Sequence, residues 1–500
     1  MRVLAIGLDA AEPTLVQDLI ARGELPELKA LVGQGSWRKV QSPATIGSGA
    51  VWPTFITGTE PAEHGIYGEW CWHPETMSLS RYHGRNLNPF WKKLVSTGTS
   101  VGLLDLPFAP FLNLEKGFEI SEWGSHDSLE GETVFSPTSV GNILDQIGQH
   151  PYTVDHLEID ESVDLEELQR LNNGSVAGVK IRGELAQRLL SEFKPGLAIV
   201  VFPEIHHASH YNWHTIAPEN SIYDKTSSRG FPNVEPTLID VYREVDRQIG
   251  RLARTVEDDT TIFVFSLHGM RPTLGVVGFL ESLMRERDFA RLTHWSTQSW
   301  KERSRSMLAA AKRNTPSSVK KLYYKTMPKK TTYLLARPTM MPSYDWLHTR
   351  AFAMQTDQHG RIRLNLRGRE LRGIVPPEEY DATCTELESL LRSLQTTNGN
   401  QLVENVIRPA KSASAALQLL LPDLIVHWRD AAFHPALKIA GSEIDARPFG
   451  LKYTGQHAFD GFCIVAGNQA TRADETIALK DLHRLICQAC ERPKSYHARV

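Results

Sequence analysis

The chain has few cysteines, little net charge and no long apolar run. Five cysteines among 500 residues are an odd and scattered set, which excludes a disulfide-stapled scaffold and fits a reducing compartment. The 55 Lys+Arg and 58 Asp+Glu residues leave a net charge of −3, so no global basic field favours nucleic acid or an anionic membrane as partner. No apolar run reaches the ~18 residues of a membrane-spanning helix. We therefore expect a cytoplasmic protein with neither partner, and the oligomeric state is left open.

Two of the cysteines, Cys487 and Cys490, have the spacing of a redox or zinc motif. They lie in a segment, 482–490, whose apolar residues recur at helical spacing, and there is no second cysteine pair. We therefore interpret both as ordinary residues of a helix.

Short apolar runs that do not alternate with polar residues recur along the chain and predict strands. They lie at 3–8, 101–105, 197–202, 260–265, 424–426 and 462–466. Such runs are typical of parallel strands that are covered on both faces. Segments with helical periodicity lie at 13–22, 26–32, 179–192 and 236–255. The alternation predicts an α/β fold with a mainly parallel sheet and helices on both sides.

Two regions lack this alternation and are interpreted as insertions. Residues 295–345 are polar and rich in Lys and Arg, which predicts a basic helical cap. The charge of this cap could steer an anionic substrate, or it could simply form a solvated helix face. Residues 108–178 have weak periodicity and are a second possible insertion. The predicted core then comprises 1–294 and 346–500.

Asp9 and Ser48 are the first candidate site residues. Asp9 follows the first apolar run directly, and open α/β sheets carry their chemistry at the carboxyl ends of their strands. Ser48 lies between Gly47 and Gly49, ahead of a segment that resembles a helix. A serine in this position is either a helix cap or a nucleophile beside backbone N–H groups. Metal ligands elsewhere in the chain must decide between these two roles.

Histidines beside other predicted strands supply candidate metal ligands. Four histidines lie within nine residues after the run at 197–202, and two of them, His206 and His210, are one helical turn apart. Imidazoles at this spacing favour zinc. His268 and His457 each lie at a turn beside a further run. Because strand ends meet at one edge of a sheet, we expect a shared cluster. Its members are Asp9, Ser48, His206, His210, His268 and His457.

Several segments of the sequence have the form of known family motifs. They are Gly7-Leu-Asp9-Ala, the segment from Ser48 to Gly58 with Pro61-x-x-His-Gly, Glu122-Trp-Gly-Ser-His-Asp127, 357–370 with Asn365 and Arg369-Glu370, Pro422-Asp423, and Thr454-Gly-Gln-His457 with Asp460-Gly461. On these segments the chain resembles the alkaline phosphatase superfamily, and within it the type I phosphodiesterase/nucleotide pyrophosphatase branch. The resemblance covers most of the chain. It implies a three-layer α/β/α fold with inserted cap regions.

The resemblance also implies a site for two metal ions, usually zinc, with Mn²⁺ or Mg²⁺ as alternatives. One ion would be held by Asp9, Ser48 and His268. The other would be held by His206, His210 and His457. Histidine stands at 206 where the family commonly has Asp, and Glu204 is a nearby carboxylate. Leu267 stands where the family usually has an Asp that binds the same ion as Asp9, so that site has fewer ligands.

The function implied by the resemblance is metal-dependent hydrolysis of a small-molecule phosphoric ester, with Ser48 as nucleophile and a phosphoseryl intermediate. Diesters are favoured over monoesters, mainly because the resemblance is to the phosphodiesterase branch. In addition, no arginine stands next to Ser48 to bind a monoester's extra charge, although an insertion could supply one. Phosphotransferase or phosphomutase chemistry and sulfate or phosphonate ester hydrolysis are alternatives. A non-catalytic metal-binding protein is a further alternative, because of Leu267.

The roles of three tryptophans and one arginine near these motifs are left open. Trp52, Trp70 and Trp123 are interpreted as core residues, with an apolar wall for the leaving group as the alternative. Arg369 is either a phosphate ligand or a structural residue of its turn.

Overall fold

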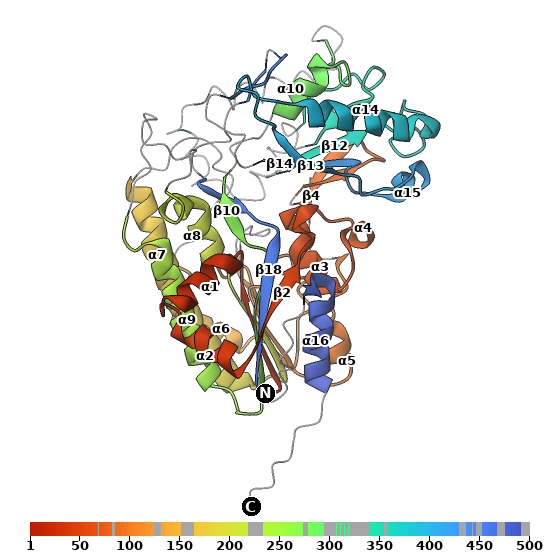
Figure 1. Ribbon diagram of the computed structural model, residues 1–500. Helices are drawn as coiled ribbons and strands as arrows, with labels where there is room; N and C mark the ends of the chain where they lie inside the picture. The colour runs from red at the N-terminus through yellow and green to blue at the C-terminus, as the bar shows by residue number, and fades with distance from the viewer. Residues whose placement is uncertain are drawn as a thin grey trace, which may run out of the picture.

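A nine-stranded sheet with helices on both faces forms the larger part of the computed structural model (Figure 1). The structure describes residues 1–68, 70–82, 86–124, 132–151, 165–218, 234–273, 279–294, 307, 311, 315, 319, 341–354, 359–429, 437–442, 444–446, 453–467 and 476–491. Along the sheet the strands are β19 (Ile477–Ala478), β2 (Gly35–Gln41), β18 (Asp460–Ala466), β9 (Thr261–Ser266), β1 (Val3–Leu8), β8 (Leu197–Phe202), β5 (Val101–Leu104), β6 (Gly117–Ser121) and β7 (Val134–Ser136).

The centre of this sheet is parallel. Strands β9, β1, β8, β5 and β6 all run in one direction, whereas β18 is antiparallel to both of its neighbours and β7 is antiparallel to β6. The predicted α/β fold with a mainly parallel sheet is therefore confirmed. The apolar runs at 3–8 and 197–202 coincide with β1 and β8.

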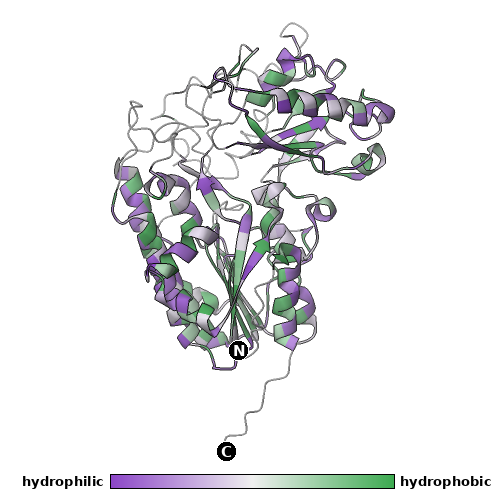
Figure 2. Cartoon of the chain, in the orientation of Figure 1, coloured by the Kyte–Doolittle hydropathy of each residue, from purple (hydrophilic) through white to green (hydrophobic). Residues whose placement is uncertain are grey.

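Alternate residues of β1 pack into two hydrophobic clusters, one on each face of the sheet. Leu4, Ile6 and Leu8 belong to one cluster, and Val3 and Ala5 to the other. The first face is covered by α1 (Pro13–Ala21), α2 (Pro26–Gln34), α6 (Val140–Ile147), α7 (Leu165–Phe193), α8 (Glu204–Asn212) and α9 (Leu238–Arg254). The second face is covered by α3 (Val51–Thr57), α5 (Trp91–Ser96) and α16 (Leu479–Glu491). Figure 2 shows the strands between these layers in the green of apolar residues.

The cysteine pair lies in α16, as the helical spacing of its segment predicts. Both Cys487 and Cys490 are free thiols. Among the described residues, no helix combines the length and the apolar character that a membrane span requires.

A second, antiparallel sheet lies beyond the carboxyl edge of the main sheet (Figure 1). Its strands, in order, are β11 (Ala351–Ala353), β12 (Gly360–Leu364), β14 (Leu424–Trp428) and β13 (Val403–Ile407). Helices α10 (Phe279–Glu286), α14 (Tyr380–Ser393) and α15 (Ala413–Gln418) contribute to a separate hydrophobic core around it. The predicted strand at 424–426 thus belongs to this second sheet and not to the main one.

The predicted domain boundaries stay a prediction. Most of the segment 295–345 lies outside the described residues. The core of the second sheet draws on residues on both sides of that segment. Within the other predicted insertion, 108–178, β6 and β7 form an edge of the main sheet.

Buried ion pairs occupy the motif segment that contains Arg369. The guanidinium of Arg369 donates to both carboxylate oxygens of Asp423, at 2.8 and 2.7 Å, and to Glu370 at 2.9 Å. Arg363 of β12 donates to the same glutamate at 2.7 Å. All four side chains are at most 2% exposed. Arg369 is therefore a structural residue of the second sheet, which answers the question left open by the sequence.

Candidate metal centre and nucleophile loop

Three parallel strands end side by side and deliver most of the predicted site residues. The register pairs Leu8 of β1 with Phe202 of β8, and Gly7 of β1 with Phe265 of β9. Asp9, the start of α8 and the turn after β9 therefore lie at the same edge of the sheet. As the sequence predicts, the strand ends meet at one edge of the sheet, and this brings together segments that are far apart in the sequence.

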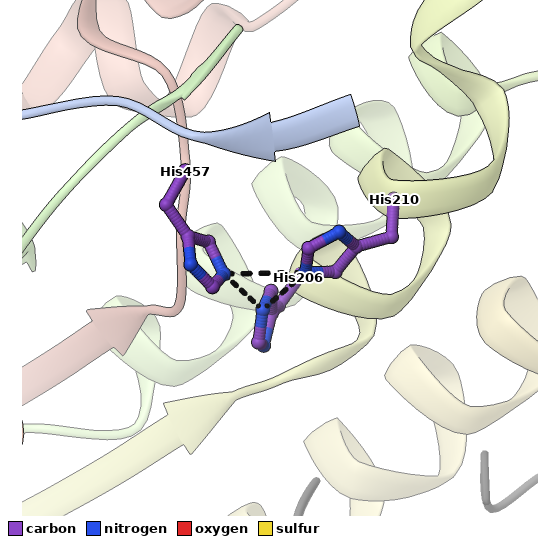
Figure 3. A group of neighbouring side chains, drawn as sticks. All are labelled: His206, His210 and His457. Carbon is purple, nitrogen blue, oxygen red and sulfur yellow. Dashed lines mark hydrogen bonds between the residues drawn. The ribbon is translucent and has the colours of Figure 1, made fainter. Parts of the chain in front are cut away.

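Three imidazoles converge at this edge (Figure 3). His206 and His210 come from successive turns of α8, and His457 comes from β17 (Gly455–His457), which pairs with β10 (Met270–Pro272). The Nε2 atom of His206 lies 2.7 Å from that of His457 and 2.8 Å from that of His210. The Nε2 atoms of His210 and His457 are 3.2 Å apart. These three side chains form a group that could hold a metal ion.

The outer nitrogens of two of these rings have partners that direct the inner nitrogens to the centre. Nδ1 of His210 lies 2.9 Å from the carbonyl oxygen of Gly455, which only accepts, so the proton is on Nδ1. Nδ1 of His206 lies 3.2 Å from Oδ2 of Asp9, whose negative charge favours a proton there too. This arrangement leaves the Nε2 lone pairs facing inward, as in metal-ligating histidines whose other nitrogen is held by a carbonyl or carboxylate.

The spacing of the three nitrogens fits a zinc ion with little movement. Zinc–nitrogen bonds of about 2.0–2.1 Å in a tetrahedron separate the ligand atoms by about 3.3 Å. The 3.2 Å between His210 and His457 already agrees with this value. The two contacts of His206 must lengthen by about half an ångström to reach it. Where two of these nitrogens both present a lone pair, as argued for His206 and His210, a cation between them would offset their mutual repulsion.

Asp9 lies between this trio and His268. Its side chain is 1% exposed. Its Oδ1 atom lies 3.9 Å from Nε2 of His268 and accepts a 3.0 Å hydrogen bond from the indole nitrogen of Trp52. The ring of His268 is also close to His457, with centroids 4.6 Å apart. The structure thus brings Asp9 and all four predicted histidines into one group, in which Asp9, His206 and His268 are buried and His210 and His457 are half-buried.

Ser48 begins the second of two short helical turns. Residues Pro43–Thr45 (η1) and Ser48–Ala50 (η2) are 3-10 turns, and α3 continues from the second of them. Trp52, four residues after Ser48, carries the indole that binds Asp9. The segment that starts with Ser48 is therefore attached to this group through the next turn of its own helix.

Leu267 directly follows β9, just as Asp9 directly follows the neighbouring strand β1. It is 1% exposed and belongs to the same hydrophobic cluster as Trp52 and Phe55. At this position, where the family resemblance implies a carboxylate, the structure has a packed apolar side chain.

Glu204, the first residue of α8, lies among other buried charges. One of its carboxylate oxygens accepts from Arg182 at 2.8 Å and lies 2.9 Å from Nε2 of His150, and Arg182 also donates to Asp105 at 2.7 Å. Burial favours a raised pKa for Glu204, but Arg182 and His150 outweigh it and hold this pKa below its usual value. Glu204 therefore supports the start of α8 through this network.

Residues from the second sheet contact the loop before Ser48, and sequence reasoning missed them. Nε2 of His359 lies 2.9 Å from the carbonyl oxygen of Ala44, and Nε2 of His427 lies 2.8 Å from that of Thr45. Arg361 of β12 lies so close to Gly47 that a side chain at position 47 would collide with its guanidinium. Single histidines far along the chain give no signal for such contacts. The only hint is that two of these residues lie in the motif segment 357–370.

Comparisons with known proteins support the family resemblance. The family model described as type I phosphodiesterase/nucleotide pyrophosphatase matches residues 3–442. A search of curated proteins found no match. Phosphonoacetate hydrolase from Sinorhizobium meliloti 1021, in complex with phosphonoacetate, is similar over 98% of this chain and 96% of that chain, with 15% identity and a TM-score of 0.54. The same hydrolase with phosphonoformate gives 14% identity and a TM-score of 0.51 over the same shares. These two structures show a likeness of fold.

Proposed function

This chain belongs to the type I phosphodiesterase/nucleotide pyrophosphatase family and is a metal-dependent hydrolase of phosphoric esters, and we propose that Ser48 is its nucleophile. One contact carries the proposal. The indole of Trp52, one turn after Ser48, donates to Asp9 within the group of histidines. Ser48 thereby begins a segment that is joined to the candidate metal ligands. A serine that only caps a helix would not need such a link.

The proposed metal ligands fall into two sets. Asp9, Ser48 and His268 form one set, and His206, His210 and His457 form the other. Zinc suits the second set, because three imidazoles whose Nε2 atoms converge are a common zinc environment. A divalent ion supplies charge that favours the serine alkoxide and offsets charge on the phosphoryl oxygens. The first set has a carboxylate, a hydroxyl and one imidazole, so we expect it to bind its ion more weakly.

The chain's own residues then carry a two-step displacement at phosphorus. Ser48 Oγ loses its proton and forms a bond to phosphorus while the bond from phosphorus to the leaving oxygen breaks, and that oxygen takes up a proton. Water attacks the phosphoseryl group in the second step, gives up a proton and releases Ser48 Oγ, which is protonated again. Asp9, held by Trp52, keeps its carboxylate beside the serine segment throughout.

A small-molecule phosphodiester is the proposed substrate class, and a monoester is the second candidate. The family name favours the diester. The monoester is favoured by Arg361, an arginine supplied from outside the segment that contains Ser48, whose buried guanidinium lies beside Gly47. A positive charge at this point would bind the extra negative charge of a monoester.

The decisive experiment compares wild type with Ser48→Ala on p-nitrophenyl phosphate and bis-p-nitrophenyl phosphate, each with Zn²⁺, Mn²⁺ and Mg²⁺. We expect the variant to lose turnover by at least about 1,000-fold, because removal of a covalent nucleophile costs this much in comparable enzymes. Ser96→Ala, which changes a serine of α5 away from the site, is the control and should keep wild-type rates. Full activity of Ser48→Ala would refute the nucleophile.

Two further measurements separate the alternatives at the same site. A brief reaction quenched in acid should leave phosphate on the peptide that contains Ser48, detectable by mass spectrometry. Transfer to an added alcohol in preference to water would instead indicate a phosphotransferase. Faster turnover of p-nitrophenyl sulfate or a phosphonate than of either phosphate ester would indicate the sulfate or phosphonate alternative.

A further inference from the structure

Two buried histidines of the second sheet reach across to the main sheet's nucleophile loop. We define this loop as residues 43–50. His359, directly before β12, and His427, within β14, are 1% and 5% exposed. Their Nε2 atoms lie 2.9 and 2.8 Å from the carbonyl oxygens of Ala44 and Thr45. Because a carbonyl oxygen only accepts, both imidazoles donate an N–H at this nitrogen.

The two carbonyls are ones that the loop cannot satisfy by itself. Ala44 and Thr45 are the last residues of η1, and the last carbonyl groups of a helical turn point outward without a partner from the turn. Pro43, by contrast, accepts within the loop from the backbone N–H groups of Ile46 and Gly47. The imidazoles thus complete the hydrogen bonding of a turn whose end lies three residues before Ser48.

The rings themselves are held from both sheets. Their centroids are 4.8 Å apart, and the ring of Phe459 lies 5.3 Å from His359 and 4.8 Å from His427. Phe459 directly precedes β18 of the main sheet. Burial lowers the pKa of His427, although its hydrogen bond to Thr45 acts in the opposite direction. Its ring is therefore neutral near pH 7 and keeps a single, defined donor.

The loop has little room to move between these contacts and Ser48. Gly47 links the two 3-10 turns in an extended conformation, with φ of 168°. A side chain at this position would collide with the carbonyl of Tyr67 and with the guanidinium of Arg361. Arg361 in turn donates to that carbonyl at 3.0 Å. A shift of Thr45 would therefore be passed to Ser48 through Ile46 and the tightly packed Gly47.

We propose that His359 and His427 are positioning residues that hold the nucleophile loop, so that the second sheet is a working part of the active site. This inference rests on the proposed function of Ser48. A displacement of about 1 Å at a reacting group can cost on the order of 100-fold in rate. Loss of either imidazole N–H frees one carbonyl of η1 and allows a displacement of this kind. Neither histidine is assigned any contact with substrate or metal.

The test compares two replacements at each histidine. His427→Leu and His359→Leu remove the donor, whereas His427→Gln and His359→Gln keep an amide N–H at a similar reach. We expect the Leu variants to lose kcat by roughly 10- to 100-fold, with KM and metal content within about twofold of wild type. The Gln variants should recover to within about fivefold of the wild-type kcat. Equal losses in Leu and Gln variants would overturn the role of the N–H donors.

Val426→Ala is the matched control for damage to the second sheet. Val426 neighbours His427 in β14, but its side chain packs in the core of the second sheet. The control should lower the melting temperature without lowering kcat of the folded protein. A loss of kcat as large as that of His427→Leu, at the same folded fraction, would overturn the proposal.

Amide hydrogen exchange of the nucleophile loop separates failure of this proposal from failure of the proposed function. We expect faster exchange in 43–50 in the Leu variants and unchanged exchange in Val426→Ala and Ser48→Ala. If Ser48→Ala is inactive while both Leu variants keep wild-type kcat and exchange, the positioning role alone is refuted. If Ser48→Ala is fully active, the proposed function fails and the positioning role fails with it.

Discussion

The indole Nε1–H of Trp52 donates a 3.0 Å hydrogen bond to Oδ1 of Asp9, so the helix after Ser48 is fixed to a candidate metal ligand. Both side chains are buried, at 2% and 1% exposure. An indole N–H is a donor only, and a carboxylate is its natural partner in an apolar setting. The contact explains why a large aromatic residue stands one turn after the proposed nucleophile.

Trp52→Phe is expected to lower kcat/KM by roughly 10- to 100-fold. The change keeps an aromatic ring but removes the N–H, and hydrogen bonds to charged groups contribute about 1.5–3 kcal/mol. The loss also frees the Asp9 carboxylate to rotate, so metal affinity should fall as well. Steady-state kinetics and metal content after dialysis measure both effects.

Phe55→Leu is the control for this variant. Phe55 lies in the same helix and its ring packs edge-on against Trp52, with centroids 5.9 Å apart. It should lose stability through poorer packing but keep its metal and most of its kcat/KM. Equal kinetic losses in the two variants would mean that packing, and not the hydrogen bond to Asp9, matters.

Glu119 is expected to make stability depend on pH. This residue of β6 is buried, and its carboxylate accepts from the backbone N–H of Leu112 at 3.1 and 3.0 Å. Burial raises its pKa to about 7, against the effect of these hydrogen bonds. Between about pH 4.5 and pH 7 the folded state therefore binds a proton that the unfolded state has released, so this contribution to stability falls as pH rises.

The measurement is urea unfolding of wild type and Glu119→Gln at pH 5 and pH 8. The difference in the free energy of unfolding between the variant and wild type should shift in favour of the variant by on the order of 2 kcal/mol from pH 5 to pH 8. Glu404→Gln, at an exposed position of β13, should follow the wild-type profile. Parallel profiles for wild type and Glu119→Gln would contradict the prediction.

The main sheet could be predicted because its strands are buried on both faces. Residues 3–8 and 197–202 are uninterrupted apolar runs, which are typical of strands that are buried on both faces. In the second sheet only β14 gave such a signal, through the run at 424–426, whereas β12 carries Arg361 and Arg363 in the sequence Gly-Arg-Ile-Arg-Leu. Both arginines are buried, and charged residues are buried only with partners that a sequence does not reveal.

Helix α7 also could be predicted only in part, because some of its stabilising contacts come from distant segments. Its predicted part, 179–192, is only the second half of a helix that begins at Leu165. The first half contains Asn172, a poor helix former, whose amide donates to Asn212 of α8 at 3.0 Å and to Pro236. Tertiary contacts therefore stabilise a helix that local propensity does not favour.

The candidate metal ligands could be anticipated because each stands beside a recognisable strand. His206, His210, His268 and Asp9 follow strand ends, and topology alone brings such positions together. The roles of Trp52 and of the two histidines of the second sheet depend on packing between distant segments. No spacing or periodicity in the sequence encodes that packing.

Arg182→Met is expected to destabilise the protein by about 3–5 kcal/mol, because it leaves two carboxylates in the core without their cation. Arg182 is fully buried and joins Asp105 to Glu204, at 2.7 and 2.8 Å. Glu204 lies two residues before His206, so metal affinity should fall together with stability. Urea unfolding and metal titration measure the two losses.

The double variant Arg182→Met with Glu204→Gln should recover part of that stability, since one uncompensated charge is removed. Arg188→Met is the control on the same helix, because Arg188 is exposed. It should be indistinguishable from wild type. A mild effect of Arg182→Met, similar to that of Arg188→Met, would show that the buried network does not support α8.

Leu267→Asp is expected to raise the number of tightly bound metal ions per chain. Leu267 is buried beside Asp9, within the apolar cluster that contains Trp52 and Phe55. A carboxylate at this position would add an oxygen ligand to the set of Asp9, Ser48 and His268. Elemental analysis after dialysis against buffered zinc should therefore give a higher zinc content than in wild type.

If Asp at position 267 binds the ion, the stability of the variant must depend on metal. This dependence distinguishes a new ligand at position 267 from extra zinc bound elsewhere on the protein. Without an ion, an aspartate at 267 is a buried charge among apolar side chains and should destabilise the fold by several kcal/mol. With an ion bound, the two charges compensate and most of that loss should be recovered. Leu267→Asn, which is of similar size but carries no charge, should lose stability whether or not zinc is present. A Leu267→Asp protein that is equally unstable with and without zinc would show that the side chain at 267 does not reach the metal centre.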